Sequence, residues 1–178
     1  MRNLFTIDLK DYSDTDVVYK RPSSRAIIIK DGKIALVYSN KYNYYKFPGG
    51  GINESEDKID ALIREVKEEV GLIVIKNSIK EYGEVKRIQK SNFNQIFYQE
   101  NYYYLCDVED NLMNQNLDEY EQDEEFILKF VDPQTAITTN FNHQDDIFRK
   151  TMIDRDAKVL ELLVKEGIIQ YEATTCRN

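Results

Sequence analysis

The chain has 178 residues, of which 42% are hydrophobic and 31% charged, and its formal net charge is −8. This length suits one globular domain, and the composition is close to that of average soluble proteins. A net acidic surface repels the phosphates of long nucleic acids, which argues against a DNA- or RNA-coating role. The sequence has no run of about eighteen apolar residues and a polar beginning, so neither a membrane span nor a signal peptide is expected. We therefore expect a cytoplasmic protein.

Histidine and cysteine are scarce. His143 is the only histidine, and the two cysteines, Cys106 and Cys176, lie far apart in the sequence. This argues against a disulfide framework, a zinc site and Ser-His-Asp chemistry. Any metal must therefore be held by oxygen atoms, which favours a hard cation such as Mg²⁺ or Mn²⁺.

The first part of the chain predicts strands that lead into a glycine-rich loop. Residues 25–30 and 34–39 are expected to pair as a hairpin through the tight turn Asp31-Gly32. A short extended segment at 45–48 then reaches Gly49-Gly50-Gly51. Three consecutive glycines allow backbone angles and close approaches that other residues forbid.

Residues 56–70 have the clearest helical pattern. Ser55 is predicted as the N-cap, and Glu56 and Asp57 suit the positive end of the helix dipole. Gly71 stands where a left-handed C-terminal cap is expected. The apolar residues recur at helical spacing, at Ile59, Leu62, Ile63, Val66 and Val70.

The remaining elements predict an α+β domain with an α/β/α sandwich arrangement. Strands are expected across roughly 79–90, 95–108 and 124–131, which are rich in β-branched and aromatic residues. A last helix across about 145–166 is most simply a core-facing amphipathic helix, although it could instead build a homodimer interface. The expected organisation is an N-terminal strand and connection at 1–22, the main domain at 23–167 and a C-terminal tail at 168–178.

Three glutamates gather on one side of the 56–70 helix. With about 100° per residue, Glu65, Glu68 and Glu69 fall in an arc about 100° wide beside the apolar stripe. Like charges this close repel one another. Lys67 points elsewhere, and Arg64 is expected to pair with only one glutamate at a time. A divalent cation would relieve the repulsion, whereas an acidic run without further context is more often a solvated helix face.

The spacing of the whole segment favours the metal site. Gly50 is followed after five residues by Glu56, and after seven more by the run from Arg64 to Leu72, REVKEEVGL. This pattern resembles the full Nudix box, and Phe47-Pro48-Gly49 resembles its usual lead-in. Seven fixed identities would coincide by chance about once in 10⁸ to 10⁹ placements. The resemblance covers the box residue by residue, and the strand order of residues 23–165 more loosely.

The resemblance implies roles for the residues of the box. The Nudix fold is a mixed β-sheet flanked by helices, in which the box forms a loop–helix–loop. By this similarity the metal ligands would be Glu65, Glu68, Glu69 and the Gly49 carbonyl, and Glu65 could instead be the base that activates water. Arg64 would orient Glu65 by a charge-assisted hydrogen bond. The positions with structural roles would be Gly50, Glu56 and Gly71.

Family members often draw a further carboxylate from a loop before a late strand. Here residues 118–125 supply several carboxylates just before the predicted strand at 124–131. Glu124 is the first choice for a further metal-binding and catalytic group, with Glu125 and Glu121 behind it. A solvated acidic loop explains the same segment equally well.

Aromatic and basic residues near the glycine loop are candidates for substrate binding. Tyr42, Tyr44 and Tyr45 precede the loop, so one of them could stack on a nucleobase. Arg25, Lys41 and Lys46 could bind phosphate, although an ordinary surface charge is the more common role for such residues.

These features predict a metal-dependent hydrolase that uses a metal-activated water to cleave the diphosphate bond of a nucleoside diphosphate linked to another moiety. Its partner would be a small nucleotide-type substrate. The alternative is a Nudix-fold sensor that binds a nucleotide without turnover, although such modules commonly lose box glutamates and this box is complete. An isomerase of the same fold would need a cysteine near the site, and neither Cys106 nor Cys176 is suitably placed.

Overall fold

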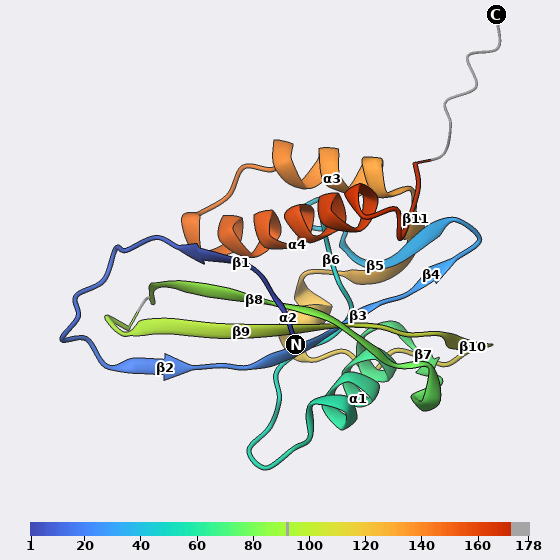
Figure 1. The fold of residues 1–178 in the computed structure, drawn as a ribbon, viewed down its shortest axis with the longest axis horizontal. Coiled ribbons are helices and arrows are strands. Elements are labelled where there is room, and N and C mark those ends of the chain that lie inside the picture. The colour runs from blue at the N-terminus through green and yellow to red at the C-terminus, as the bar shows by residue number, and fades with distance from the viewer. Residues whose placement is uncertain (92, 172–178) are drawn as a thin grey trace, which may run out of the picture.

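The structure is a computed structural model that describes residues 1–91 and 93–171, so Cys176 and most of the expected C-terminal tail lie outside the described residues. Its β-strands lie between two layers of helices (Figure 1). Helix α1 (Lys58–Val70) covers one side, and α3 (Pro133–Asn142) and α4 (Ile147–Lys165) cover the other. The α+β class and the α/β/α layering predicted from the sequence are confirmed.

One mixed sheet is built around β9 (Ile96–Leu105). Strand β8 (Lys80–Lys90) pairs antiparallel with β9, and β1 (Asn3–Asp8) is parallel to β8. Strands β2 (Val18–Lys20) and β3 (Ser23–Ile27) follow one another along the other edge of β9, both parallel to it. The N-terminal segment therefore contributes strands to the same sheet as the central part of the chain.

A second sheet is built around β5 (Lys33–Ser39). It pairs antiparallel with β4 (Ile29–Lys30), β6 (Tyr44–Lys46) and β11 (Phe126–Val131). The remaining short elements are β7 (Leu72–Val74), which pairs with β10 (Val108–Leu112), the 3-10 turn Lys76–Ser78 and helix α2 (Glu119–Asp123).

The predicted strand at 25–30 is in fact divided between the two sheets. Residues up to Ile27 pair with β9, whereas Ile29 and Lys30 pair with β5 through a turn at Asp31 and Gly32, whose φ angles are 52° and 74°. The predicted hairpin is confirmed, but the chain changes sheets at Ile28. Hydrophobic pattern alone does not reveal such a change, because both halves are equally apolar.

Helix α1 begins two residues later than expected. Asp57 is the N-cap, because its side chain accepts a hydrogen bond of 2.8 Å from the Ile59 amide, so the prediction of Ser55 was wrong. Ser55 instead has a φ of +65° in the preceding turn. At the other end Gly71 has a φ of +69°, which confirms the left-handed cap.

Helix α3 was not predicted, although its first residues carry a recognisable signal. The Asp132 side chain accepts hydrogen bonds from the amides of Gln134 and Thr135, and Pro133 occupies the first turn. An N-cap aspartate followed by proline is a common helix start. The weakly apolar sequence that follows hides this helix from an analysis of periodicity.

Alternating residues of the strands supply two hydrophobic cores, one on each side. Ala26 and Val37 pack on the α1 side, whereas Ile27 and Leu36 pack on the α4 side with Leu160 and Leu163. Adjacent tyrosines separate in the same way: Tyr44 enters the first core and Tyr45 the second. Strand alternation therefore decides which of these side chains can reach a site on a given face.

A buried polar network joins α4 to the strands. Asp156 accepts hydrogen bonds from the Tyr103 hydroxyl (2.7 Å), from Arg155 Nε (2.8 Å) and from the Phe47 amide (3.2 Å). Arg155 also donates to the Asn101 side chain at 2.7 Å. Burial opposes ionisation of Asp156, but the adjacent Arg155 guanidinium holds the pKa of Asp156 below its usual value. Since Phe47 leads into the glycine loop, this network helps to fix where that loop begins.

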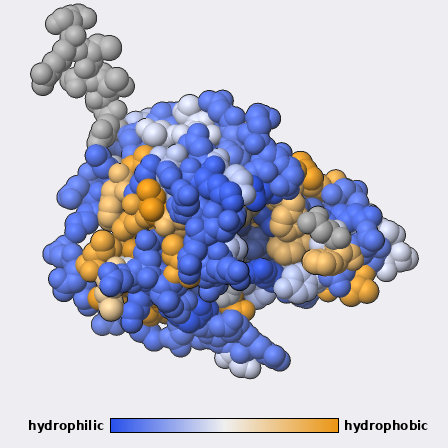
Figure 2. Space-filling view, turned by 180° about the vertical axis from the view of Figure 1, so that it is seen from behind, coloured by the Kyte–Doolittle hydropathy of each residue, from blue (hydrophilic) through white to orange (hydrophobic). Residues whose placement is uncertain are grey.

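Most of the visible surface is hydrophilic (Figure 2). Hydrophobic residues gather at the end of the molecule where β2 and the β8–β9 hairpin lie, and Val17, Val18 and Phe93 are exposed there. Over residues 1–91 and 93–171, none of the helices combines the length and apolar character needed to cross a membrane.

We predict that Asp156→Asn lowers the free energy of unfolding by about 3–5 kcal/mol, because it leaves the buried Arg155 guanidinium without its counter-charge. Urea unfolding of the purified variant measures the change. Asp154→Asn on the same helix is the control: its ion pair with Lys150 is partly exposed, and its loss should cost less than about 1 kcal/mol. Equal costs for the two variants would contradict the assigned role of the network.

Candidate active site

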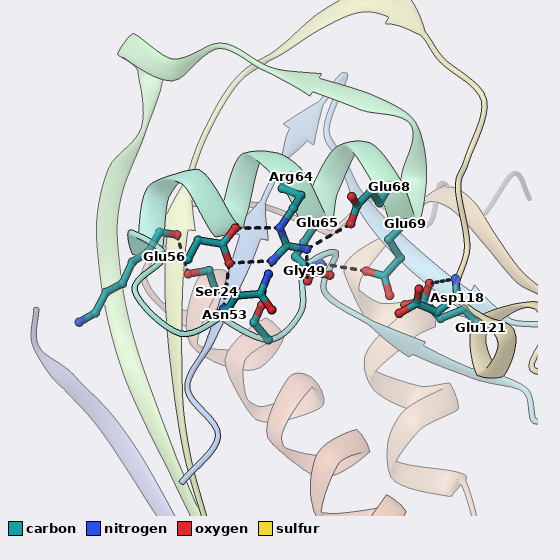
Figure 3. Close-up of polar contacts among 12 residues, drawn as sticks. Ser24, Gly49, Asn53, Glu56, Arg64, Glu65, Glu68, Glu69, Asp118 and Glu121 are labelled. Carbon is teal, nitrogen blue, oxygen red and sulfur yellow. Dashed lines mark hydrogen bonds and ion pairs between the residues drawn. The ribbon is translucent and has the colours of Figure 1, made fainter.

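Arg64 holds three of the glutamates in and before helix α1. Its Nε and Nη2 atoms each donate to one oxygen of Glu56 at 2.8 Å, and Nη1 donates to Glu65 at 2.6 Å and to Glu68 at 3.1 Å (Figure 3). Nη2 also donates to the Gly51 carbonyl at 3.1 Å. All five guanidinium donors are thus directed at acceptors. The expectation that Arg64 pairs with one glutamate at a time was wrong.

Glu56 connects the glycine loop to the helix. Besides the two bonds from Arg64, its carboxylate accepts a hydrogen bond of 2.9 Å from the Asn53 amide. The hydrogen bonds from Arg64 lower the pKa of Glu56 to about 2, against an ordinary value of 4.5. A carboxylate held in this way stays ionised at neutral pH and keeps Arg64 in place beside Glu65.

Gly49 and Gly50 lie very close to neighbouring groups. A Cβ at Gly50 would lie 2.0 Å from a carboxylate oxygen of Glu65, so this glycine leaves the space that the carboxylate occupies. A Cβ at Gly49 would lie 2.1 Å from the Ser24 carbonyl, and Gly49 has a φ of +131°. The loop therefore passes directly between strand β3 and the glutamates of α1.

Glu69 is buried and faces a buried lysine. Its Oε2 accepts a hydrogen bond of 2.9 Å from the Gly49 amide, and its Oε1 forms an ion pair with Lys46 Nζ. Burial raises the pKa of Glu69, and the charge of Lys46 opposes this shift. Lys46 is only 6% exposed, so its reading as an ordinary surface charge was wrong.

Arg25 also lies inside the protein rather than on its surface. It is 6% exposed, and Nη1 donates to the carbonyls of Gly49 (2.5 Å) and Phe47 (3.4 Å). The Gly49 carbonyl, expected to face a metal, therefore accepts a hydrogen bond from a guanidinium here. Arg25 and Lys46 together bring two positive charges to the inner side of the glycine loop.

Of the three candidates for a further carboxylate, two lie near the box. Glu124 accepts a hydrogen bond of 2.6 Å from the Tyr44 hydroxyl. Glu121 is 5% exposed, accepts hydrogen bonds from the Asp118 amide and the Tyr120 hydroxyl, and lies close to Glu69 (Figure 3).

The third candidate, Glu125, is exposed and points away. Its carboxylate accepts a hydrogen bond of 2.7 Å from the Asn40 side chain. Its φ of +53° turns the chain between α2 and β11. Of the three candidates, Glu121 and Glu124 therefore lie near the box and Glu125 does not.

A pocket of about 420 Å³ lies beside these residues. The glycine loop, with Glu65 and Glu124, forms one part of its wall, and strands β8 and β9 with the start of α4 form another. Larger cavities occur elsewhere among the described residues, but none of those three is lined by a glutamate or a glycine of the box. The basic side chains that line the pocket are Arg21, Arg25, Lys46, Arg87 and Arg149.

The tyrosines proposed to stack on a base have different positions. Tyr44 lines the pocket while its ring packs edge-on against Phe126. Tyr42 lies against the Arg149 guanidinium, 4.1 Å from Cζ to the ring centre, and is not part of the lining. Tyr45 packs against Tyr38 on the α4 side, which argues against a stacking role for Tyr45. The aromatic lining that the sequence analysis missed comes from Phe97, Tyr120, Phe126 and Phe148.

The donor atoms fit a hard divalent cation chemically. Glu65, Glu68 and Glu69 supply oxygen atoms from one side of α1, and Glu68, 40% exposed at its side chain, forms an ion pair with Arg64. Within the part of the chain that the structure describes, no three acidic, histidine or cysteine side chains converge closely enough to hold a metal. Instead, Arg64 forms an ion pair with Glu65, and Lys46 forms one with Glu69.

Cys106 cannot serve as a nucleophile in this arrangement. It follows β9 and is 6% exposed, and burial raises the pKa of its thiol to about 12. A neutral, buried thiol is unreactive. Cys106 is therefore unsuited to the nucleophile role that an isomerase of this fold would need.

Comparison with known proteins identifies the family. The NUDIX domain model matches residues 20–153, so the chain belongs to the Nudix family, as the box resemblance predicts. An 8-oxo-dGTP diphosphatase from Buchnera aphidicola is 39% identical over 62 residues, which cover 35% of this chain and 45% of that protein. The match thus spans less than half of the curated relative. Both findings support an enzyme of the pyrophosphohydrolase class.

Solved structures confirm the fold. A NUDIX hydrolase from Nitrosomonas europaea superimposes with a TM-score of 0.55 and 16% identity, over 90% of this chain and 97% of the other. A MutT protein from Bacillus halodurans superimposes with a TM-score of 0.54 and 14% identity, over 75% and 80% of the two chains. At these identities the likeness concerns the arrangement of strands and helices alone.

We predict that Gly49→Ala lowers the free energy of unfolding by about 2–4 kcal/mol, because the new methyl group meets the Ser24 backbone and φ is unfavourable for alanine. Chemical denaturation measures the loss. Gly51→Ala is the matched control in the same loop, since its Cβ would be 3.6 Å from the nearest atom, a side-chain atom of Arg21. A neutral Gly49→Ala would show that the loop is not held against β3 as described.

A second prediction concerns pH. Because the pKa of Glu56 in the folded protein is about 2 and its ordinary value is 4.5, its ionisation stabilises the fold above about pH 4.5. This stabilisation is lost as the pH falls from about 4.5 towards 2. Glu56→Gln should cost about 1.5–3 kcal/mol at pH 7, and the difference from the unmodified protein should shrink below pH 4.5. Unfolding titrations across this range test it, and a difference independent of pH would refute the ionic role.

Proposed function

We propose that the chain is a divalent-cation-dependent pyrophosphohydrolase that cleaves the diphosphate bond of a nucleotide-type substrate. One observation carries this proposal: Glu65 and the glycine loop of a complete Nudix box line a pocket whose other walls are mainly basic and aromatic. Carboxylates alone suit cations, and basic groups alone suit anions. Their combination in one pocket suits a phosphate chain that is bound together with a cation.

The pocket chemistry agrees with a nucleotide. Basic side chains can neutralise phosphate oxygens, and Phe97, Tyr120 and Phe148 provide apolar rings for a base. The name of the Buchnera relative adds nucleoside triphosphates to the candidate substrates. A pocket of about 420 Å³ is within the usual range for a small-molecule site.

Glu65, Glu68, Glu69 and the Gly49 carbonyl would hold the cation, with Glu121 or Glu124 as the added carboxylate. When bound, Mg²⁺ or Mn²⁺ neutralises phosphate charge and lowers the pKa of a water. Glu65 is the residue we assign to proton uptake. Burial raises its pKa while Arg64 opposes the shift, so the carboxylate is oriented by Arg64 and is more basic than a solvated one.

A metal-independent nucleotide-binding module is the second candidate. Two buried basic side chains favour this candidate. Lys46 already neutralises Glu69, and Arg25 already donates a hydrogen bond to the Gly49 carbonyl. Such a module would bind its nucleotide equally well in EDTA and release no product. The hydrolase requires at least the Lys46 pairing to be exchanged for the cation.

The test is hydrolysis of a panel of nucleoside triphosphates, ADP-ribose, dinucleoside polyphosphates and nucleotide sugars with Mg²⁺ or Mn²⁺. We expect turnover of one class, abolished by EDTA and reduced about 10²-fold or more by Glu68→Gln, which removes charge from the cation site without burying a new group. Glu161→Gln, an exposed change on α4, should have no effect. Turnover that persists in Glu68→Gln would reject the proposed metal site, and binding without turnover would favour the module.

A further inference from the structure

Arg87 is a buried guanidinium that lines the pocket beside the box. It is 3% exposed, and its Nε and Nη1 atoms are buried without a hydrogen-bond partner in the described part of the chain. No ion pair is formed by Arg87 with the described residues. Buried donors are almost always satisfied, so two unsatisfied ones on one charged group call for a ligand.

The sheet and α4 together place Arg87 in the pocket. Val85, Arg87 and Gln89 share one face of β8, and Arg87 lies opposite Gln99 in the antiparallel register with β9. The guanidinium packs on the rings of Phe97 and Phe148, with Cζ 4.9 Å from each ring centre. These contacts fix the plane of the group but leave its N–H edge for an acceptor.

The electrostatic surroundings are positive although the chain as a whole is acidic. Five basic and three acidic side chains line the pocket, whereas the formal net charge of the protein is −8. Burial, together with the nearby charges of Arg155 and Arg25, lowers the pKa of Arg87 to about 9, although Asp156 opposes the shift. Arg155 is neutralised by Asp156, whereas the hydrogen bonds that Arg25 donates to described residues go to carbonyl groups. In the part of the chain that the structure describes, Arg25 and Arg87 are thus two buried guanidinium groups that form no ion pair with a carboxylate.

We propose that Arg87, with Arg25, binds a phosphate group of the substrate outside the scissile diphosphate, so that the chain prefers a nucleoside polyphosphate to a diphosphate that ends in an uncharged sugar. This inference rests on the proposed function, because it assumes that the reaction is hydrolysis of a diphosphate bond. A phosphate offers several oxygens, and a planar guanidinium donates to two of them at once. Arg25 reaches from this group to the Gly49 carbonyl, which places the phosphate site next to the glycine loop.

The first test is binding without metal. In EDTA, tripolyphosphate should stabilise the protein against heat and bind at least ten-fold more tightly than pyrophosphate, as measured by calorimetry. Arg87→Met should weaken tripolyphosphate binding ten-fold or more, and its Tm without ligand should be equal or higher, because a desolvated charge is replaced by an apolar side chain of similar length. Lys86→Met is the matched control, since it removes one charge from the adjacent, half-exposed position on the other face of β8.

Two outcomes would overturn the proposal: unchanged tripolyphosphate binding in Arg87→Met, or an equal loss in Lys86→Met. If Arg87→Met does not fold, Arg87→Lys serves instead, because it keeps the charge but not the paired donors, and should weaken binding about three- to ten-fold.

The second test is substrate preference with Mg²⁺. In Arg87→Met the ratio of kcat/KM for a nucleoside triphosphate over a nucleotide sugar should fall ten-fold or more. An unchanged ratio would contradict the phosphate role. Failure of hydrolysis altogether would concern the proposed function, whereas the EDTA measurement tests the phosphate site separately.

Discussion

Four carboxylates occupy a small region along and just before helix α1, and positive side chains hold them there. Arg64 directs its five donors at Glu56, Glu65, Glu68 and the Gly51 carbonyl, while Lys46 neutralises Glu69 inside the protein. Without these cations the like charges would repel one another. The glycine loop is packed against the same region, because a Cβ at position 49 would overlap the β3 backbone and one at position 50 would displace the Glu65 carboxylate.

Local patterns in the sequence were enough to predict the parts of the fold that depend on neighbours along the chain. The helical spacing of Leu62, Val66 and Val70, the cap at Gly71 and the turn at Asp31-Gly32 all appear as expected. The start of α1 was misplaced because Arg64, a full two turns away, draws Glu56 out of the helix. An interaction of this kind depends on tertiary structure and is not visible in a capping pattern.

Only the acidic residues of the candidate site could be predicted from the sequence. The spacing of the box identifies Glu65, Glu68 and Glu69, whereas the basic half comes from strands that are distant in sequence. Arg25 and Lys46 resemble surface charges until β3 and β6 are placed beside the glycine loop. Arg87 carries a signal that could have been used, since period-two alternation from Val85 places it on the inward face of β8. Burial of a charge is decided by the sheet that surrounds it, which is why it was missed.

Arg155 and Arg87 illustrate how the same side chain acquires different roles. Both are buried on the α4 side of the sheet, but Arg155 is paired with Asp156 and hydrogen-bonded to Asn101, so its charge is compensated within the fold. Arg87 has aromatic rings where Arg155 has a carboxylate, and rings orient a guanidinium without neutralising it. An uncompensated buried charge destabilises a protein. The buried charge of Arg87 is therefore explained by a ligand that enters the pocket from solution. An anion next to the box glutamates would neutralise this charge and accept hydrogen bonds from the unsatisfied donors.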